Sequence, residues 1–171
     1  MLKIIPATKK DAELIYNLAA EVFTAAYEKI LSPPQSAYML EMMYAPAATA
    51  KNIDEGQEYF LLKKDNDFIG YAAVEQEAEN LFHLQKIYVL PDYQGIGAGR
   101  FLFLEIINYL KNKTQTPFTV ELNVNRYNEK AIAFYKQMGF TVVRQGDFPI
   151  GNNYFMNDFI MQLSIKKKNI K

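Results

Sequence analysis

The stretch that decides the fold of this 171-residue chain reads Leu90-Pro91-Asp92-Tyr93-Gln94-Gly95-Ile96-Gly97-Ala98-Gly99-Arg100. Three glycines fall within five residues, between a β-prone run and an apolar pattern with helical spacing. Such glycines let backbone N–H groups converge on one point, and the helix that follows adds the positive end of its dipole. Arg100 adds a cation at the rim. A plain strand-to-helix turn needs only one glycine, so the stretch predicts an anion-binding loop.

Two common phosphate loops do not fit this spacing. A P-loop requires Gly-Lys followed by Ser or Thr, whereas the last glycine here precedes Arg100-Phe101. A dinucleotide fingerprint requires Gly-x-Gly-x-x-Gly and an acidic residue about 20 residues later. The chain has Gln115 and Thr116 in that region. A mononucleotide-binding module is therefore disfavoured, and the loop alone leaves the anion open.

Strands and helices are predicted on both sides of this loop. Strand patterns cover residues 2–5, 59–63, 68–74, 81–90, 118–124, 140–144 and 159–165. Helical patterns cover 14–23, with Thr8 as its cap, then 33–43, 97–110 and 128–138. The polar turn at 65–67 predicts an antiparallel hairpin, and a Gly/Asn-rich loop is expected between the last two strands. Strand 81–90, helix 97–110 and strand 118–124 imply a parallel pair.

The composition limits the classes of function. Lys plus Arg equals Asp plus Glu at 19 each, so no overall charge favours nucleic acid or an anionic membrane. Without cysteine there is no disulfide or thiolate site, and the single histidine, His83, excludes a multi-histidine metal centre. We expect no metal, signal peptide or transmembrane span, a cytoplasmic location, and a solvated tail at Lys166-Lys167-Lys168.

Two motifs together resemble those of the GNAT superfamily of N-acetyltransferases. Residues 94–99 match the family's Gln/Arg-x-x-Gly-x-Gly/Ala pyrophosphate loop, and residues 128–140 match its Asn-x-x-Ala-x-x-x-Tyr-x-x-x-Gly-Phe signature. Their order and spacing agree with the family over about residues 58–165. The resemblance implies one α/β (α+β) domain over 1–171, with a mixed, mostly antiparallel sheet of six to seven strands, a central splayed parallel pair and helices on both faces. The chain looks most similar to the bacterial polyamine (spermidine/spermine) members.

The resemblance also implies acetyl-CoA as the cosubstrate. The pantetheine arm would lie along Ile87, Tyr88 and Val89, where a backbone N–H near Ile87 would polarise the thioester carbonyl. Asn128 would steady the arm from the opposite side. The pyrophosphate would bind to the loop, at Gln94, Gly95, Ile96, Gly97, Ala98, Gly99 and Arg100.

Tyr135 falls on the family's general acid, which protonates the departing thiolate. On the residues alone, packing in the core is the simpler interpretation of Tyr135, and the motif reverses that preference. The amine must lose a proton before it attacks, and His83 or Glu121 is the predicted acceptor, through a water chain. Many relatives carry Glu where this chain has Asn123, so a direct carboxylate base at that position is in doubt.

The acceptor is predicted to be a primary amine, which includes polyamines, amino metabolites and protein N-termini. It should enter beside the first two helices, where Phe23, Tyr44, Asn153 and the substrate candidates Tyr27, Tyr38, Tyr88 and Tyr154 are expected to gather. Glu28, Glu41 and Asp147 would attract a cation, although isolated acidic residues are more often solvated. The final strand offers an edge through which a homodimer would pair. A non-catalytic acyl-CoA-binding sensor is the alternative function.

Overall fold

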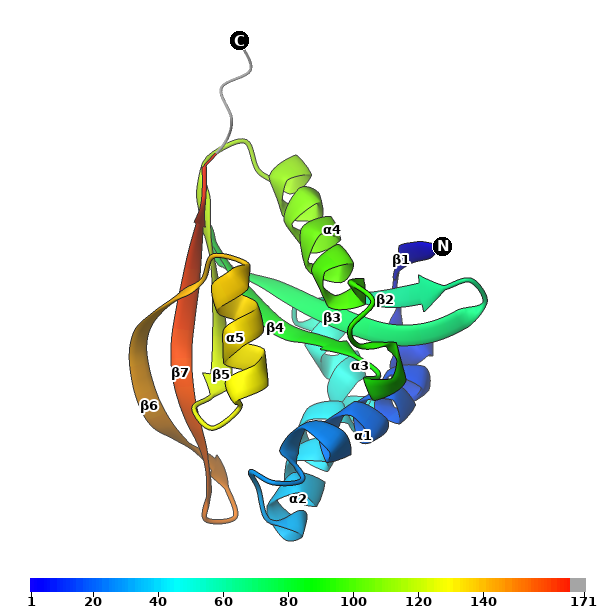
Figure 1. Cartoon of the computed structure of the whole chain (residues 1–171), viewed down its shortest axis with the longest axis vertical. Helices are drawn as coiled ribbons and strands as arrows, with labels where there is room; N and C mark the ends of the chain where they lie inside the picture. The colour runs from blue at the N-terminus through cyan, green and yellow to red at the C-terminus, as the bar shows by residue number, and fades with distance from the viewer. Residues whose placement is uncertain (167–171) are drawn as a thin grey trace.

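The structure is built on one seven-stranded sheet with the strand order β1-β2-β3-β4-β5-β7-β6. This computed structural model describes residues 1–166 (Figure 1). Neighbouring strands are antiparallel except β4 and β5, which are parallel. The mixed, mostly antiparallel sheet with one parallel pair is thus confirmed. The strands are β1 (Leu2–Pro6), β2 (Glu58–Lys64), β3 (Asp67–Ala78), β4 (Leu81–Val89), β5 (Phe118–Asn125), β6 (Thr141–Gly151) and β7 (Tyr154–Ile165).

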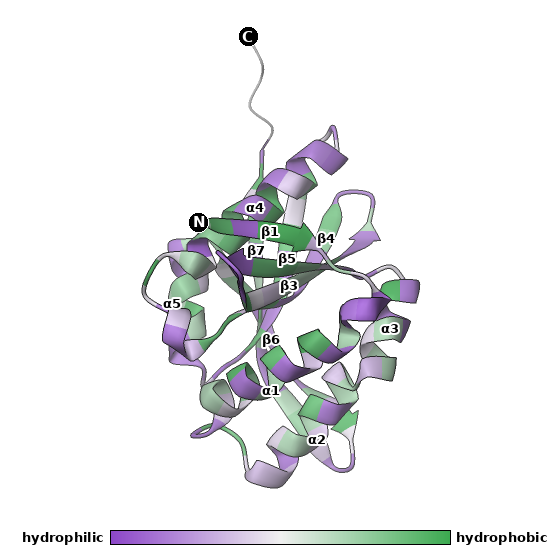
Figure 2. Ribbon diagram, turned by 90° about the vertical axis from the view of Figure 1, so that its right-hand side faces the viewer, coloured by the Kyte–Doolittle hydropathy of each residue, from purple (hydrophilic) through white to green (hydrophobic). Residues whose placement is uncertain are grey.

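Helices cover both faces of the sheet and enclose two cores. On one face, α1 (Ala12–Tyr27), α2 (Pro33–Tyr44) and α3 (Pro46–Asp54) pack on β2 and β3 around Leu61 and Tyr71 (Figures 1 and 2). On the other face, α4 (Ala98–Lys113) and α5 (Glu129–Gln137) pack on the side of β5 that carries Val120, Leu122 and Val124. Because side chains alternate along a strand, Glu121 and Asn123 face the α1–α2 side.

Three local elements differ from the sequence prediction. Thr8 caps a short 3₁₀ helix, η1 (Lys9–Asp11), rather than α1, because it forms a reciprocal capping box with Asp11. Helix α3 was not predicted; Pro46 begins it, and Thr49 is the only one of its residues that is buried. The expected Gly/Asn-rich loop is the tight end of a long hairpin. The backbone is left-handed at Gly151, the last residue of β6, and at the turn residues Asn152 and Asn153, where asparagine tolerates it, so β6 and β7 extend up to the turn.

The strand edges do not support pairing of two copies through the final strand. Strand β7 lies inside the sheet, with β5 on one side and β6 on the other, so both of its backbone edges are already hydrogen-bonded. The expectation that this strand pairs between subunits is therefore wrong for this fold. Within the described sheet, the outer strands are β1 and β6.

Two expectations from composition can be placed on the structure. None of the helices within residues 1–166 is long and apolar enough to cross a membrane. Of the three lysines expected to form a solvated tail, Lys166 is exposed, and Lys167 and Lys168 lie outside the described residues.

One lysine is buried in the core below α2. Lys86 on β4 is only 5% exposed, and its Nζ donates to the Tyr59 hydroxyl and lies 4.6 Å from the centre of the Tyr44 ring. Burial lowers the pKa of Lys86 from 10.5 to about 8, because the ammonium loses hydration that its tyrosine neighbours replace only in part. The folded state therefore bears a cost at neutral pH, where Lys86 is charged.

We predict that Lys86→Met stabilises the protein at pH 7 by about 1–3 kcal/mol, since it removes a buried charge and keeps the volume. The folded pKa lies below the unfolded value, so wild-type stability should rise as pH increases from about 8 to 10.5. The advantage of the variant should shrink over the same interval. Urea unfolding of both proteins at pH 7 and pH 10 measures this, and a destabilised variant at pH 7 would show that the cation–aromatic contacts outweigh desolvation.

Candidate active site

The parallel strands β4 and β5 separate partway along their length. They pair only at Leu81↔Thr119, Phe82↔Val120 and His83↔Glu121, and then diverge (Figure 1). The register between β3 and β4 shifts at the same level, which leaves Gln85 as an extra residue in β4. Such a bulge bends a strand and increases its twist. Beyond it, residues 87–89 pair with β3 on one side and have no β5 partner on the other.

A cleft of about 650 Å³ opens beside this unpaired edge. It lies between the end of β4, the glycine loop, the start of α4, helix α5 and part of α1. The predicted cofactor residues that line it are Ile87, Tyr88, Val89, Gln94, Gly95, Gly97, Ala98, Gly99, Arg100 and Asn128. Ile96 is about half exposed and does not line the cleft. The sequence-predicted loop and strand edge are thus brought together in one concave site.

The glycine loop gives one end of the cleft a positive character. Gly95 and Gly97 have φ angles of 83° and 81°, and Gly97 is the N-cap of α4. No side chain caps this 16-residue helix, so its first N–H groups face the loop without a side-chain acceptor. Among residues 1–166, the charged side chains that line the cleft are Arg100 and Lys130, and both are cationic. This end of the cleft therefore suits a phosphate-bearing ligand.

Helix α5 forms the opposite wall of the cleft. Asn128 begins it, because its Oδ1 accepts the Ala131 N–H at 3.2 Å. Lys130 donates from Nζ to Oε1 of Gln94, whose Nε2 in turn donates to the Val89 carbonyl at 3.0 Å. These bonds connect the helix, the glycine loop and the end of β4. The loop is consequently held in place from the α5 side.

Tyr135 lies on α5 at the border between cleft and core. Its side chain lines the cleft but is only 9% exposed, and its ring packs edge-on against Phe140. Burial, and next the neighbouring Tyr88, raise the pKa of Tyr135 far above the usual 10.0. The phenol is therefore protonated at neutral pH and can donate a proton. The packing of Tyr135 agrees with the core interpretation, and its role as the general acid stays a prediction.

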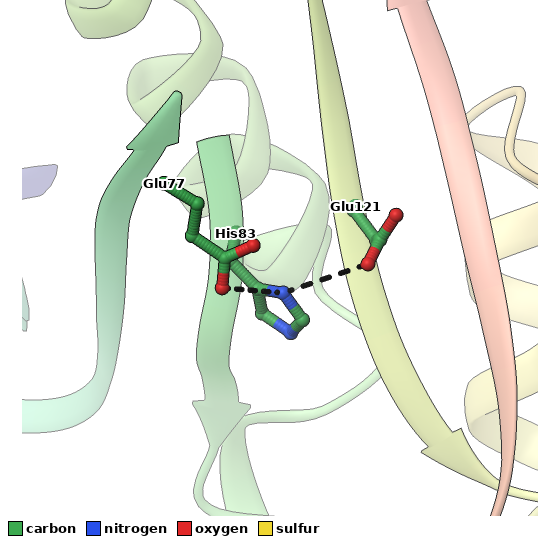
Figure 3. A group of neighbouring side chains, drawn as sticks. All are labelled: Glu77, His83 and Glu121. Atoms are coloured by element: carbon green, nitrogen blue, oxygen red, sulfur yellow. Dashed lines mark ion pairs between the residues drawn. The ribbon is translucent and has the colours of Figure 1, made fainter. Parts of the chain in front are cut away.

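His83 and Glu121 lie where the strands separate, outside the lining of the cleft (Figure 3). His83 Nδ1 is 3.2 Å from a Glu77 oxygen and 4.0 Å from a Glu121 oxygen, and it has no hydrogen-bond partner of acceptable geometry. Glu121 is engaged elsewhere, since it accepts from Arg144 Nη2 at 3.1 Å and Gln162 Nε2 at 2.6 Å.

Glu77, His83 and Glu121 together carry the donor atoms of a divalent-cation site, all within 4.8 Å of one another. However, the oxygens of Glu121 already accept from a guanidinium and an amide. Glu121 of β5 is thus hydrogen-bonded to Arg144 of β6 and Gln162 of β7, whereas His83 of β4 only lies near it.

The tyrosines expected around the acceptor form two separate pairs. Tyr27 at the end of α1 and Tyr88 on β4 belong to the same core, and burial raises the pKa of each. Tyr38 on α2 stacks on Tyr154 at 5.4 Å and donates to the Ile150 carbonyl, so it holds α2 against the β6–β7 hairpin. Only the first of these pairs reaches the cleft, through Tyr88.

The remaining acceptor candidates serve other contacts. Tyr44 is fully buried and accepts a hydrogen bond from Tyr71 at 2.8 Å. Phe23 packs on Tyr44 within the same core, so the dense aromatic pattern of α1 and α2 belongs mainly to packing. Glu41 accepts from Tyr16, and Asp147 forms an ion pair with Arg126. Asn153 lies in the tight turn of the β6–β7 hairpin.

Sequence reasoning missed two charged residues, Lys130 in the lining of the cleft and Asp158 in the interior. Lys130 lies within the second motif, and the helical period places it on the same side of α5 as Phe134, four residues later, which also lines the cleft. Asp158 on β7 is 2% exposed and contacts Asn123, whose Nδ2 donates to its Oδ2 at 3.3 Å. Burial raises the pKa of Asp158 above the usual 3.8. Because residues 145–158 were predicted as loop, nothing in the sequence placed Asp158 inside the molecule.

Known proteins of similar sequence are N-acetyltransferases. Residues 14–140 match the model of the acetyltransferase (GNAT) family. An uncharacterized N-acetyltransferase of Mycobacterium tuberculosis is 26% identical over 88% of this chain and 96% of its own. The [ribosomal protein bS18]-alanine N-acetyltransferase of Haemophilus influenzae is 27% identical over 81% of this chain and 88% of its own.

A solved structure shows the same fold over nearly the whole length. It is the PaiA N-acetyltransferase from Thermoplasma acidophilum in complex with coenzyme A, which is 23% identical, covers 98% of this chain and 99% of its own, and superposes with a TM-score of 0.80. The overall fold of the chain is thus shared with that structure. This chain belongs to the acetyltransferase (GNAT) family.

Proposed function

We propose that this protein transfers the acetyl group of acetyl-CoA to a primary amine, by direct attack within a ternary complex. The observation that carries the proposal is a single cleft that contains an unpaired strand edge, an uncapped helix start and a buried, protonated tyrosine. An amide-rich arm suits the strand edge, and a diphosphate suits the helix start. The structural relative that was solved with coenzyme A supports this choice of ligand.

Each part of the cleft would have its own role in the reaction. Backbone groups of residues 87–89 would bind the pantetheine arm, and the N–H near Ile87 would stabilise the oxyanion that forms at the thioester carbonyl. Residues 94–100, with Ile96 the least enclosed, would bind the pyrophosphate, and Asn128 and Lys130 would close the site from α5. Tyr135 would give its proton to the departing thiolate.

The amine would approach from the α1–α2 side, past Tyr27 and Tyr88. His83 and Glu121 remain our predicted proton acceptors, and their position outside the cleft requires a water chain between them and the amine. The acceptor class stays broad. A polyamine or a small amino metabolite fits the predicted cationic substrate, and the ribosomal-protein alanine acetyltransferases among the relatives favour a protein N-terminus equally.

The function is tested by thermal shift with acetyl-CoA, followed by a panel of amines assayed for thiol release. A ligand present at 100 times its Kd should stabilise the fold by about 2.7 kcal/mol, so saturating acetyl-CoA should raise Tm by several degrees. At least one class among polyamines, amino acid amides and N-terminal peptides should then release coenzyme A with saturation kinetics. Stabilisation without release by any class would favour the sensor, and stabilisation by ATP but not acetyl-CoA would exclude both.

A further inference from the structure

Three side chains from three neighbouring strands converge on one nitrogen atom. Glu77 of β3, His83 of β4 and Glu121 of β5 point toward one another (Figure 3). One carboxylate oxygen of each glutamate and Nδ1 of the histidine all lie within 4.8 Å of one another. Imidazole nitrogen and carboxylate oxygen are both ligands of divalent transition metals such as Zn²⁺. None of the three residues lines the cleft, and the proposed function gives Glu77 no role.

The backbone of the sheet brings this group together. His83 and Glu121 are opposite each other in the last pair of β4 and β5 before these strands diverge. Glu77 occupies a β-bulge, because the register between β3 and β4 shifts there and leaves it without a partner in β4. Such a bulge turns a side chain away from its regular direction. The group therefore depends on strand pairing between distant parts of the chain, which no short motif could indicate.

Nδ1 of His83 is buried beside negative charge without a hydrogen bond. It lies 3.2 Å from a Glu77 oxygen and 4.0 Å from a Glu121 oxygen, and no hydrogen bond joins it to either. An unprotonated Nδ1 would place its lone pair beside carboxylate oxygens, which repel it, and a protonated Nδ1 would have a buried N–H without an acceptor. A cation between the three atoms would satisfy all of them.

The distances suit a metal ion better than a proton. Two ligands that are each about 2.0–2.1 Å from a tetrahedral Zn²⁺ are about 3.4 Å apart, close to the 3.2 Å between His83 Nδ1 and Glu77. Because two ligands meet at the ion at an angle, neither lies on the other's lone-pair axis. A hydrogen bond instead requires a nearly straight N–H···O arrangement. The Glu121 oxygen, at 4.0 Å, would have to approach by about 0.6 Å.

Glu121 is held in place as a ligating carboxylate would be. Its side chain is 10% exposed, and its Oε2 accepts from Gln162 Nε2 at 2.6 Å. Outer hydrogen bonds of this kind commonly orient metal ligands. Arg144 donates to Oε1 at 3.1 Å, and its positive charge would oppose a metal ion. However, a carboxylate oxygen has two lone pairs, and the Arg144 side chain is 59% exposed and has room to turn into solvent. Arg144 should therefore weaken a metal ion's binding without preventing it.

We propose that Glu77, His83 and Glu121 bind a divalent transition-metal ion such as Zn²⁺, through one oxygen of each glutamate and Nδ1 of the histidine. The imidazole ligand favours Zn²⁺ over Mg²⁺ and Ca²⁺, which prefer oxygen ligands. A bound ion would connect β3, β4 and β5 where the parallel strands begin to separate. Because His83 and Glu121 are also the predicted proton acceptors, the ion would inhibit acetyl transfer. That consequence rests on the proposed function, whereas metal binding does not.

The test is calorimetric titration of Zn²⁺ into the full chain, freed of metal by a chelator and of any affinity tag. One ion should bind per chain. His83→Ala and Glu77→Gln should each raise the Kd for Zn²⁺ about 10-fold or more, because each removes a ligand atom. Arg144→Gln should lower that Kd about 3-fold or more, because it removes the neighbouring cation. This gain in affinity cannot result from a damaged fold.

Glu75→Gln is the matched control for Glu77→Gln. Glu75 pairs in register with His83, but it is not part of the group of three, and its carboxylate accepts from Gln85 Nε2 at 3.1 Å. Its loss should change the Kd for Zn²⁺ less than about 3-fold. All four variants should bind acetyl-CoA as tightly as the wild type, since none of these residues lines the cleft. Titration of acetyl-CoA thus keeps a failure of this proposal distinct from a failure of the proposed function.

Three results would overturn the proposal. An unchanged Kd for Zn²⁺ in His83→Ala would place the ion elsewhere. Equal losses in Glu75→Gln and Glu77→Gln would mean that the negative charge of this part of the sheet attracts cations without a defined site. Binding of Mg²⁺ at lower concentration than Zn²⁺ would exclude the imidazole as a ligand.

Discussion

Tyr135→Phe is expected to lower kcat about 100- to 1000-fold and to leave the Kd for acetyl-CoA within about 3-fold of the wild-type value. The phenol lies in the cleft wall and burial has raised its pKa, so it holds its proton until the thiolate departs. The ring itself packs on Phe140, and phenylalanine keeps that contact. The loss should therefore appear in turnover and not in binding. Stopped-flow or steady-state thiol release, with calorimetric titration of acetyl-CoA, measures the two quantities.

Tyr109→Phe is the matched control for this variant. Tyr109 lies on α4 and donates its hydroxyl to Glu58, and both residues line a smaller pocket that shares no residue with the cleft. Removing that hydroxyl should cost about 1 kcal/mol of stability and leave kcat unchanged. A Tyr135→Phe variant that keeps the wild-type kcat at all pH values would show that water or another group protonates the thiolate. Because the pKa of Tyr135 lies above 10.0, its ionisation should also cause no loss of wild-type activity up to pH 10.

The parts of the site that follow from backbone geometry were predictable from sequence. Gly95 and Gly97 have a left-handed φ, which the glycines in the sequence indicate. Asn128 caps α5, and asparagine before a helical pattern indicates such a cap. The parallel pair followed from the strand-helix-strand order alone. These features are local, so a short motif contains all the information that they need.

The parts that depend on long-range packing were not predictable. Asp158 becomes buried only because β7 is inserted between β5 and β6, a pairing that the Gly/Asn-rich stretch gave no reason to expect. His83 and Glu121 were chosen by position relative to the motif, and the place where the strands separate decides whether they reach the cleft. Tyr38 and Tyr44 look equivalent in sequence, yet one holds a hairpin and the other fills a core.

A substitution in the glycine loop should lower the affinity for acetyl-CoA, and a matched substitution elsewhere should not. Gly97→Ala is expected to raise the Kd for acetyl-CoA about 10-fold or more, because alanine is strained at a φ of 81° and relief of that strain turns the N–H groups at the start of α4. No heavy atom lies within 4 Å of the position that the added Cβ would take. The effect on binding would thus come from the backbone conformation and not from a steric clash inside the protein.

Gly56→Ala is the matched control, because it also places alanine at a positive φ but at a different site. Gly56 has a φ of 114°, and its added Cβ would also meet nothing within 4 Å. Gly56 follows α3 and does not line the cleft, so both variants should lose about 1–2 kcal/mol of stability while only Gly97→Ala loses affinity. Calorimetric titration of acetyl-CoA into each variant decides the matter. Equal affinities in the two variants would mean that the phosphates bind elsewhere, since a ligand held by the N–H groups of residues 97–100 must respond when their direction changes.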